Sequence, residues 1–301
     1  MTHQFTWTPS TNITQHAGRP ILANIEFFAA PPLEIGQVTS AESTLKTSTK
    51  LVSTPLKIII CLVSGLVGTG VTWQLTSSVW FAGIIGSLAV LIAYGKTAFF
   101  HYCSYVGEKG VATYEIKGDR LQVPKAKILR FQDTTNLYTS QTQNYVNFFY
   151  RGTSYSYRFE QKSEKPFHLY GEHRSRKGYP EDKDSWHLAN AAEVAWINYL
   201  FPVVDEQVAR SGYVEFPMKG YPKAVRVGPA FLEFVLEDGV VQRVQVADMR
   251  KITLGSGTFY FEHDDSPWWS NKGAYSFQYN DIPNAKLFLF YLKRLTGIEW
   301  S

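Results

Sequence analysis

The feature that most constrains this chain is the stretch from residue 56 to 95, in which Lys57 is the one charged residue. A membrane-spanning helix needs about 20 apolar residues to cross a hydrocarbon core of about 30 Å. The apolar region divides into two segments of that length, 56–75 and 79–100, on either side of the neutral sequence QLTSS. We therefore predict a transmembrane helical hairpin over residues 56–104, with a tight turn at the membrane surface.

Aromatic and small residues in this region favour a hairpin. Trp73 and Trp80 flank the turn, and an amphipathic indole ring prefers the membrane interface. Small residues at four-residue spacing allow two membrane helices to approach closely. We expect the two helices to pack through glycines from both segments, namely Gly65, Gly68, Gly83 and Gly86.

The distribution of lysine predicts the orientation of the hairpin. The turn has no Lys or Arg, whereas lysines lie on the outer side of both segments, at Lys46, Lys50, Lys57, Lys96, Lys109 and Lys117. Because cytoplasmic loops carry the excess of positive charge, we expect an integral membrane protein with both termini in the cytoplasm. Two other arrangements stay open: a buried hairpin in a soluble protein, and a re-entrant hairpin that does not cross the bilayer.

Residues 1–55 are polar, and we interpret them as an N-terminal segment and linker. The Ser/Thr-rich run TSAESTLKTSTK at 39–50 is typical of a linker that leads into the membrane. One apolar patch, at 21–38, is expected to form a strand or short helix that docks elsewhere. The first residues have neither the basic region nor the apolar region of a signal peptide.

Charge and cysteine content exclude two classes of protein. With 30 Lys and Arg against 26 Asp and Glu, the net charge of +4 is far from the concentrated positive face of a nucleic-acid binder. We therefore expect no nucleic-acid partner. The two cysteines, Cys61 and Cys103, cannot build a disulfide framework, and we expect both to be reduced.

The remaining two thirds of the chain is rich in short runs with the alternation and β-branched or aromatic content of antiparallel strands. In the first part, 105–211, such runs occupy 111–117, 120–124, 126–133, 144–151 and 154–161, with a hairpin turn expected at Arg151-Gly152-Thr153. A charged loop at 164–184 then precedes a helix that starts near Asp184 or Ser185.

The second part, 212–301, repeats this plan. Strands are expected at 212–219, 223–228, 230–238, 240–246, 258–265 and 273–280. A closing helix follows, with Asp281 as its N-cap and Gly297 as its stop signal. Each part therefore consists of strands closed by one C-terminal helix, without a clean residue repeat.

This layout resembles the pleckstrin-homology-like (PH-like) barrel, through residues 111–161 with 185–201 and 212–280 with 281–296. Together with the hairpin, it is similar to bacterial membrane-anchored proteins that carry PH-like domains. The resemblance implies that the protein is integral to the bacterial inner membrane. The implied fold is an α+β membrane protein: a two-helix transmembrane hairpin, then two antiparallel β-rich PH-like domains, each closed by a C-terminal helix. The implied role is recognition or scaffolding. A single large α+β domain is the structural alternative.

Motifs for catalysis and metal binding do not stand out. His263-Asp264-Asp265 and the histidines at 168, 173 and 187 fit no metal-ligand spacing. No G-x-S-x-G elbow is present, and Gly255-Ser256-Gly257 has no following Lys for a phosphate loop. We therefore predict no enzyme activity, no metal and no cofactor.

Two sets of residues are candidates for contacts. Basic residues near the first hairpin of a PH-like barrel commonly bind lipid headgroups, and here these are Lys117, Arg120, Lys125, Lys127, Lys219 and Lys223. Exposed tryptophans and mixed charge mark protein contacts, here Trp268, Trp269, Arg174, Arg176 and Lys177. The predicted function is a membrane-anchored scaffold or adaptor for a protein partner. An immunity-type protein whose hairpin blocks or forms a pore, an anionic-lipid sensor and a homo-oligomer stay open.

Overall fold

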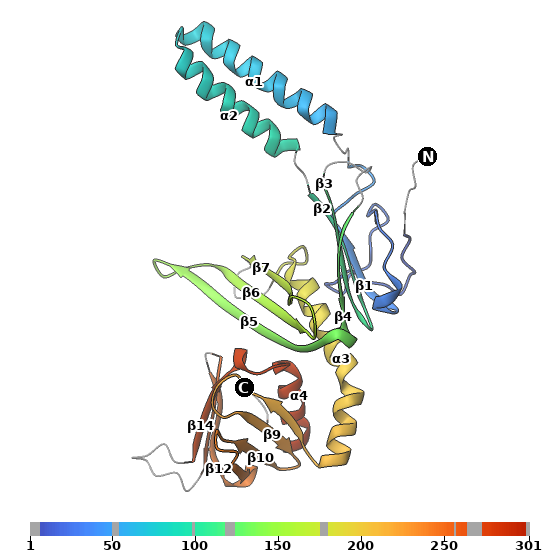
Figure 1. Cartoon of the computed structure of the whole chain (residues 1–301), viewed down its shortest axis with the longest axis vertical. Coiled ribbons are helices and arrows are strands. Elements are labelled where there is room, and N and C mark those ends of the chain that lie inside the picture. The colour runs from blue at the N-terminus through green and yellow to red at the C-terminus, as the bar shows by residue number, and fades with distance from the viewer. Residues whose placement is uncertain are drawn as a thin grey trace. The chain divides into compact units, whose positions relative to one another are not determined.

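The computed structural model describes residues 7–49, 54–97, 100–117, 124–174, 180–255, 257–263 and 273–298. The described residues form four α-helices and four antiparallel sheets, so the fold class is α+β. The chain divides into two compact units: Met1–Gly107 with Val111–Ile128, and Glu108–Gly110 with Leu129–Ser301. Figure 1 shows the elements in chain order.

The N-terminal unit is built on a four-stranded meander in the order β1-β2-β3-β4. These strands are β1 (Val38–Ser43), β2 (Phe100–Gly107), β3 (Gly110–Lys117) and β4 (Lys125–Arg130). One face of the sheet covers a small core that includes Phe27, Ile35, Cys103 and Tyr105. Trp7 packs edge-on against both Phe27 and Tyr105, with ring centroids 5.0 and 5.1 Å away.

This arrangement differs from the linker expected for residues 1–55. The polar run at 39–50 contains β1, which pairs with β2 from Val38↔Gly107 to Ser43↔Cys103. The patch at 21–38 docks as expected, because Phe27 and Ile35 lie in the core. The boundary expected at residue 105 falls inside β2, since the strand after the hairpin completes the sheet that β1 begins.

Two apolar helices, α1 (Thr54–Thr76) and α2 (Val79–Thr97), are inserted between β1 and β2 and run antiparallel (Figure 1). By length and composition, α1 is the one helix among the described residues that is long and apolar enough to cross a membrane. The apolar part of α2, Val79–Gly95, is shorter. None of the residues in the most apolar window of α1 is buried.

The C-terminal unit begins with a three-stranded sheet, β5 (Thr134–Val146), β6 (Phe149–Gln161) and β7 (Phe167–His173). The β5–β6 turn lies at Asn147-Phe148, where both residues have positive φ, and not at 151–153 as predicted. Gly152 instead lies within β6 opposite Asn144, beside an irregularity in the register. The expected loop at 164–184 contains β7. Helix α3 (Trp186–Ser211) then starts after Ser185, as predicted, and continues through Pro202 to Gly212.

The second half of this unit has a four-stranded meander, a three-stranded meander and a helix. Its elements are β8 (Val214–Pro217), β9 (Ala224–Gly228), β10 (Phe231–Val235), β11 (Val241–Gln245), β12 (Met249–Gly255), β13 (Thr258–His263), β14 (Ala274–Gln278) and α4 (Ala285–Thr296). The 3-10 turn η5 (Tyr279–Asp281) precedes α4, so Asn284 and not Asp281 is the N-cap. Gly297 ends the helix at a φ of 74°, as predicted.

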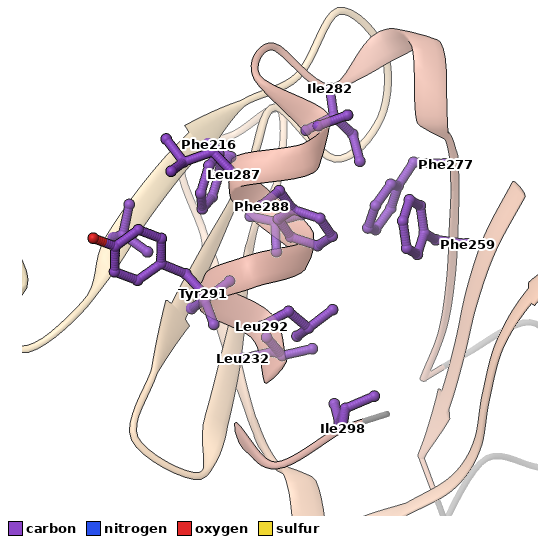
Figure 2. Packing of buried hydrophobic residues seen from close by; sticks show 14 of the residues in the cluster. Phe216, Leu232, Phe259, Phe277, Ile282, Leu287, Phe288, Tyr291, Leu292 and Ile298 are labelled. Carbon is purple, nitrogen blue, oxygen red and sulfur yellow. The ribbon is translucent and has the colours of Figure 1, made fainter. Parts of the chain in front are cut away.

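Helix α4 supplies the centre of the largest core. Figure 2 shows Phe288 pointing toward Phe259 and Phe277. Phe288 meets Phe259 and Phe216 edge-on, at centroid distances of 5.3 and 5.2 Å. Each fully buried aromatic side chain removes a large apolar area from water, so α4 and the strands stabilise each other.

The order of elements repeats along the chain. Strands β1–β4, the 3-10 turn η2 (Phe131–Asp133), strands β5–β7 and α3 are followed by β8–β11, the 3-10 turn η4 (Val246–Asp248), β12–β14 and α4. In each copy the first amide of the 3-10 turn donates to a carbonyl between the second and third strands, Phe131 N to Lys109 O and Val246 N to Ala230 O, both at 2.9 Å. The helical hairpin is therefore an insertion in the first copy of a repeated plan.

Candidate membrane-anchoring site

The two helices of the hairpin meet through glycines. A Cβ atom placed on Gly65 would lie 2.7 Å from Val90 Cγ2, and one on Gly68 would lie 3.0 Å from Ala89 Cβ. A Cβ on Gly86 would collide with Thr69 Oγ1 and lie 3.2 Å from the Gly65 carbonyl oxygen. These three glycines therefore set how closely the helices approach, as small residues do in membrane helix pairs.

Gly83, the fourth glycine expected at this contact, lies elsewhere. It is exposed, and among the described residues no heavy atom beyond its chain neighbours and its own helix lies within 4 Å of a Cβ placed on it. The contact face of α2 runs through Ala82, Gly86 and Ala89, and Ala82 is buried. Gly83 follows Ala82 by one residue, about 100° around the helix, so it points away from α1.

The outer surface of the hairpin is apolar and exposed. Leu66 is 74% exposed and Trp80 85%, and the other large exposed residues are Leu56, Ile58, Ile59, Leu62, Val63, Val67, Val71, Trp73, Leu75, Val79, Phe81, Ile84, Ile85, Leu88, Leu91 and Ile92. A contiguous apolar surface of this extent is far larger than the few hundred Å² that soluble monomers expose. In water, exposing this apolar surface costs free energy. Lipid hydrocarbon around the two helices would remove that cost.

Aromatic and cationic side chains lie at the two ends of the hairpin. Trp73 and Trp80 flank the turn. At the base, the Lys57 ammonium lies 4.6 Å from the ring centroid of Tyr94, and the Lys117 ammonium lies 5.4 Å from that of Phe100. Aromatic rings and lysines are the side chains that mark the headgroup level of membrane proteins.

The predicted headgroup residues separate into two groups. Lys125 and Lys127 are exposed on β4, in the same sheet as Lys117. In the C-terminal unit, Lys219 lies 3.4 Å from the ring centroid of Tyr138, and burial lowers its pKa. Lys223 pairs with Glu237 at 3.3 Å. Arg120 lies outside the described residues.

The predicted protein-contact residues fall mostly outside the described part of the chain. Trp268, Trp269, Arg176 and Lys177 belong to the ranges that the structure does not describe. Arg174 is highly exposed and lies 3.8 Å from Glu172 at the end of β7. Of these five predicted contact residues, Arg174 is therefore the one that lies in the described part of the chain, and its side chain is exposed.

The C-terminal unit contains a polar cavity of about 390 Å³, lined by residues of β5, β6 and α3, by Gly257 and by residues 278–280 at the end of β14. The acidic residue in this lining is Glu193, which is 5% exposed and whose carboxylate lies 3.5 Å from Lys286 Nζ. Burial raises the pKa of Glu193, although the charge of Lys286 opposes this rise. Burial also raises the pKa of Tyr157 and Tyr279 in the same wall. The sequence signal for Glu193 was weak, because it resembles an ordinary polar residue of an amphipathic helix.

These groups do not form a recognised catalytic constellation. Among the described residues, no group of three or more His, Cys, Asp or Glu side chains is placed to hold a metal ion. Cys103 is buried, and burial raises the pKa of its thiol to about 12, so it is a poor nucleophile at neutral pH. Its thiol donates to the hydroxyl of Tyr105 at 2.8 Å, a core contact.

The sequence was compared with protein-family models and with curated proteins. No protein-family model matches the sequence, and no curated protein matches it either. We therefore infer the function from the hairpin, its packing and its surroundings.

Proposed function

We propose that this chain is a membrane-anchored, non-catalytic scaffold that displays its β-rich parts at the cytoplasmic face of the bacterial inner membrane and holds a protein partner there. The observation that carries this proposal is the exposed apolar hairpin inserted between β1 and β2. At 1.5 Å per residue, α1 is about 34 Å long and α2 about 28 Å, close to a hydrocarbon core of about 30 Å.

The pairing of β1 with β2 supports two crossings. Ser43 of β1 lies opposite Cys103 of β2, so the chain leaves one strand and returns to its neighbour. Because both strands belong to one sheet, they lie on the same side of the membrane, and the segment between them must cross an even number of times. If α1 crosses once, α2 brings the chain back.

The lysines at the hairpin base support a cytoplasmic sheet. Lys57 and Lys117 lie beside Tyr94 and Phe100, and the turn has no Lys or Arg. Anionic lipids of the cytoplasmic leaflet attract basic residues near the surface at about 1 kcal/mol each. We therefore also propose that Lys117, Lys125 and Lys127 contact lipid headgroups.

The glycine contacts favour an anchor over a pore. Gly65, Gly68 and Gly86 face the partner helix of the same chain. The faces that these three glycines form are therefore occupied within the hairpin and are not free to pack against another copy. The repeated plan of four strands, three strands and a helix is also what the resemblance to PH-like domains leads us to expect of a recognition module.

Purification in a mild detergent, with identification of co-purifying proteins, tests the scaffold role. We expect a partner with the full chain and its loss in the Trp268→Ala/Trp269→Ala variant. The matched control is Tyr170→Ala, which removes an aromatic side chain that is 76% exposed on β7. Retention of every partner by the double variant would show that these tryptophans are not the contact. If no protein co-purifies with the full chain, the proposed scaffold role is contradicted.

A further inference from the structure

The hairpin of β5 and β6 ends in an exposed apolar tip. Strand β7 pairs with β6 only from Thr153 to Phe159, so the part of β5 and β6 beyond Thr153 is a two-stranded ribbon (Figure 1). At its apex, Phe148 is fully exposed and Phe149 is 74% exposed. Tyr145 and Val146 on the facing strand are also exposed.

Contacts within the ribbon hold the tip in one shape. The rings of Tyr145 and Tyr150 pack edge-on across the strands, with centroids 5.8 Å apart. Asn144 Nδ2 donates to Ser154 Oγ at 2.7 Å, and the hydroxyls of Tyr150 and Thr153 lie 2.7 Å apart. The apolar side chains are therefore presented on an organised support.

Phe148 is a poor choice for stability at this position. The two-residue turn requires φ values of 49° at Asn147 and 65° at Phe148. Asn tolerates this left-handed region, but the second position of such a turn strongly prefers Gly, because a side chain there is strained. Phe148 gains no burial in return. A strained and exposed aromatic residue points to a role outside the folding of the chain.

The surroundings of the tip favour a lipid surface. No Asp or Glu occurs between residues 134 and 159, whereas Arg151 lies close to the turn; the acidic side chain of Glu172 on β7 lies farther back, beside Gly152. Taking about 200 Å² for each exposed aromatic side chain, the tip offers on the order of 500 Å² of apolar surface. This is less than the about 800 Å² that each partner of a stable protein interface supplies. A bilayer interface has no minimum area and favours aromatic side chains one by one.

We propose that the tip formed by Tyr145, Val146, Phe148 and Phe149 inserts into the interface of the bilayer that holds the α1–α2 hairpin, as a second membrane contact. This inference rests on the proposed membrane anchoring. Anchoring by the hairpin would raise the effective concentration of lipid around the unit that carries the tip, so that a small apolar surface suffices for contact.

Depth measurement by spin labelling tests this proposal in the full chain. A nitroxide is attached to Val146→Cys in a Cys61→Ser background, in lipid nanodiscs that contain anionic lipid. Cys103 is fully buried and stays unlabelled. We expect the label to collide with oxygen several-fold more than with a water-soluble nickel complex, and this preference to be lost in Phe148→Ser/Phe149→Ser.

Two further labels and variants separate the possible failures. A label at Leu66→Cys, on the exposed face of α1, must be shielded from nickel; if it is not, the anchoring itself is wrong. If Leu66→Cys is shielded but the tip label reacts equally with nickel with and without Phe148 and Phe149, the tip inference is overturned. Shielding of the tip only after addition of soluble proteins also overturns it, in favour of a protein contact.

The variant Phe148→Gly tests whether the residue serves the fold. We expect its thermal midpoint to be unchanged or raised, while nickel access at position 146 increases. A large fall in the midpoint would assign Phe148 a structural role and contradict the inference.

Discussion

Asn284 is the residue whose replacement tests the C-terminal unit most sharply. It stands at the N-cap of α4 in the left-handed region, with a φ of 57°. Its Oδ1 accepts hydrogen bonds from Trp196 Nε1 at 2.7 Å and from Leu137 N at 3.0 Å. The backbone N–H of Asn284 donates to the carbonyl oxygen of Leu137 at 2.7 Å. One side chain therefore joins β5, α3 and α4.

The Asn284→Ala variant should be strongly destabilised. Trp196 and Leu137 are each only 1% exposed, so both donors would lose their acceptor inside the protein. Each unsatisfied donor costs about 1–3 kcal/mol, and a left-handed Ala adds about 1–2 kcal/mol. We expect a loss of about 3–8 kcal/mol in the free energy of unfolding, a large part of the about 5–15 kcal/mol that holds a typical domain together.

Chemical unfolding of the full chain in detergent, followed by near-UV circular dichroism, measures this loss. The matched control is Asn284→Asp, which keeps an acceptor oxygen and tolerates the left-handed conformation. We expect it to lose about 1 kcal/mol or less. Equal losses in the Ala and Asp variants, or a loss under about 1 kcal/mol for Ala, would refute the assignment of these hydrogen bonds.

Three other changes have defined outcomes. Gly86→Ala should lower the thermal midpoint in detergent, because its Cβ meets Thr69 and the Gly65 carbonyl, whereas Gly83→Ala points into open space and should not. Because burial raises the pKa of Glu193 above its ordinary value of 4.5, the folded state binds this proton more tightly, and stability should fall as pH rises above 4.5. Glu193→Gln should flatten that fall in a series of thermal midpoints from pH 5 to 8. Phe288→Ala should cost about 3–5 kcal/mol in chemical unfolding.

The contrary results are equally specific. Equal effects of Gly86→Ala and Gly83→Ala would mean that the helices do not pack through the Gly86 face. An unchanged pH slope in Glu193→Gln would mean that this carboxyl is ionised as easily in the folded state as in the unfolded chain. A loss under about 1 kcal/mol for Phe288→Ala would mean that Phe288 is not fully packed.

Local patterns predicted the elements that are stabilised locally. The alternation in KAVRVG and AYSFQYN marks β9 and β14, and the apolar spacing before Gly297 marks α4. The apolar run also located α1 and α2 to within a few residues. In these segments, the apolar side chains that form the sequence pattern are also the ones that lie together on one face or surface of the element.

Long-range pairing and turn geometry could not be predicted in this way. Strand β1 has the sequence VTSAES, and its partner β2 follows only after the inserted hairpin. Gly152 suggested a turn because Gly is the usual turn residue, but Asn147 and Phe148 make it. A turn at Gly152 makes residues 144–151 one continuous strand, so the sequence pattern does not reveal the exposed tip. The cavity around Glu193 depends on elements far apart in the chain, so no local pattern marks it.

The central claim is that both helices of the hairpin cross the bilayer and that its turn lies on the far side from the sheet. Two variants measure this in right-side-out inner-membrane vesicles, each with one cysteine added to a Cys61→Ser background in which Cys103 is buried: Gln74→Cys next to the turn and Lys125→Cys on β4. A membrane-impermeant maleimide should label position 74 in intact vesicles and position 125 only after permeabilisation. Labelling of both positions from the same side, or recovery of the full chain in the supernatant after ultracentrifugation without detergent, would contradict the account.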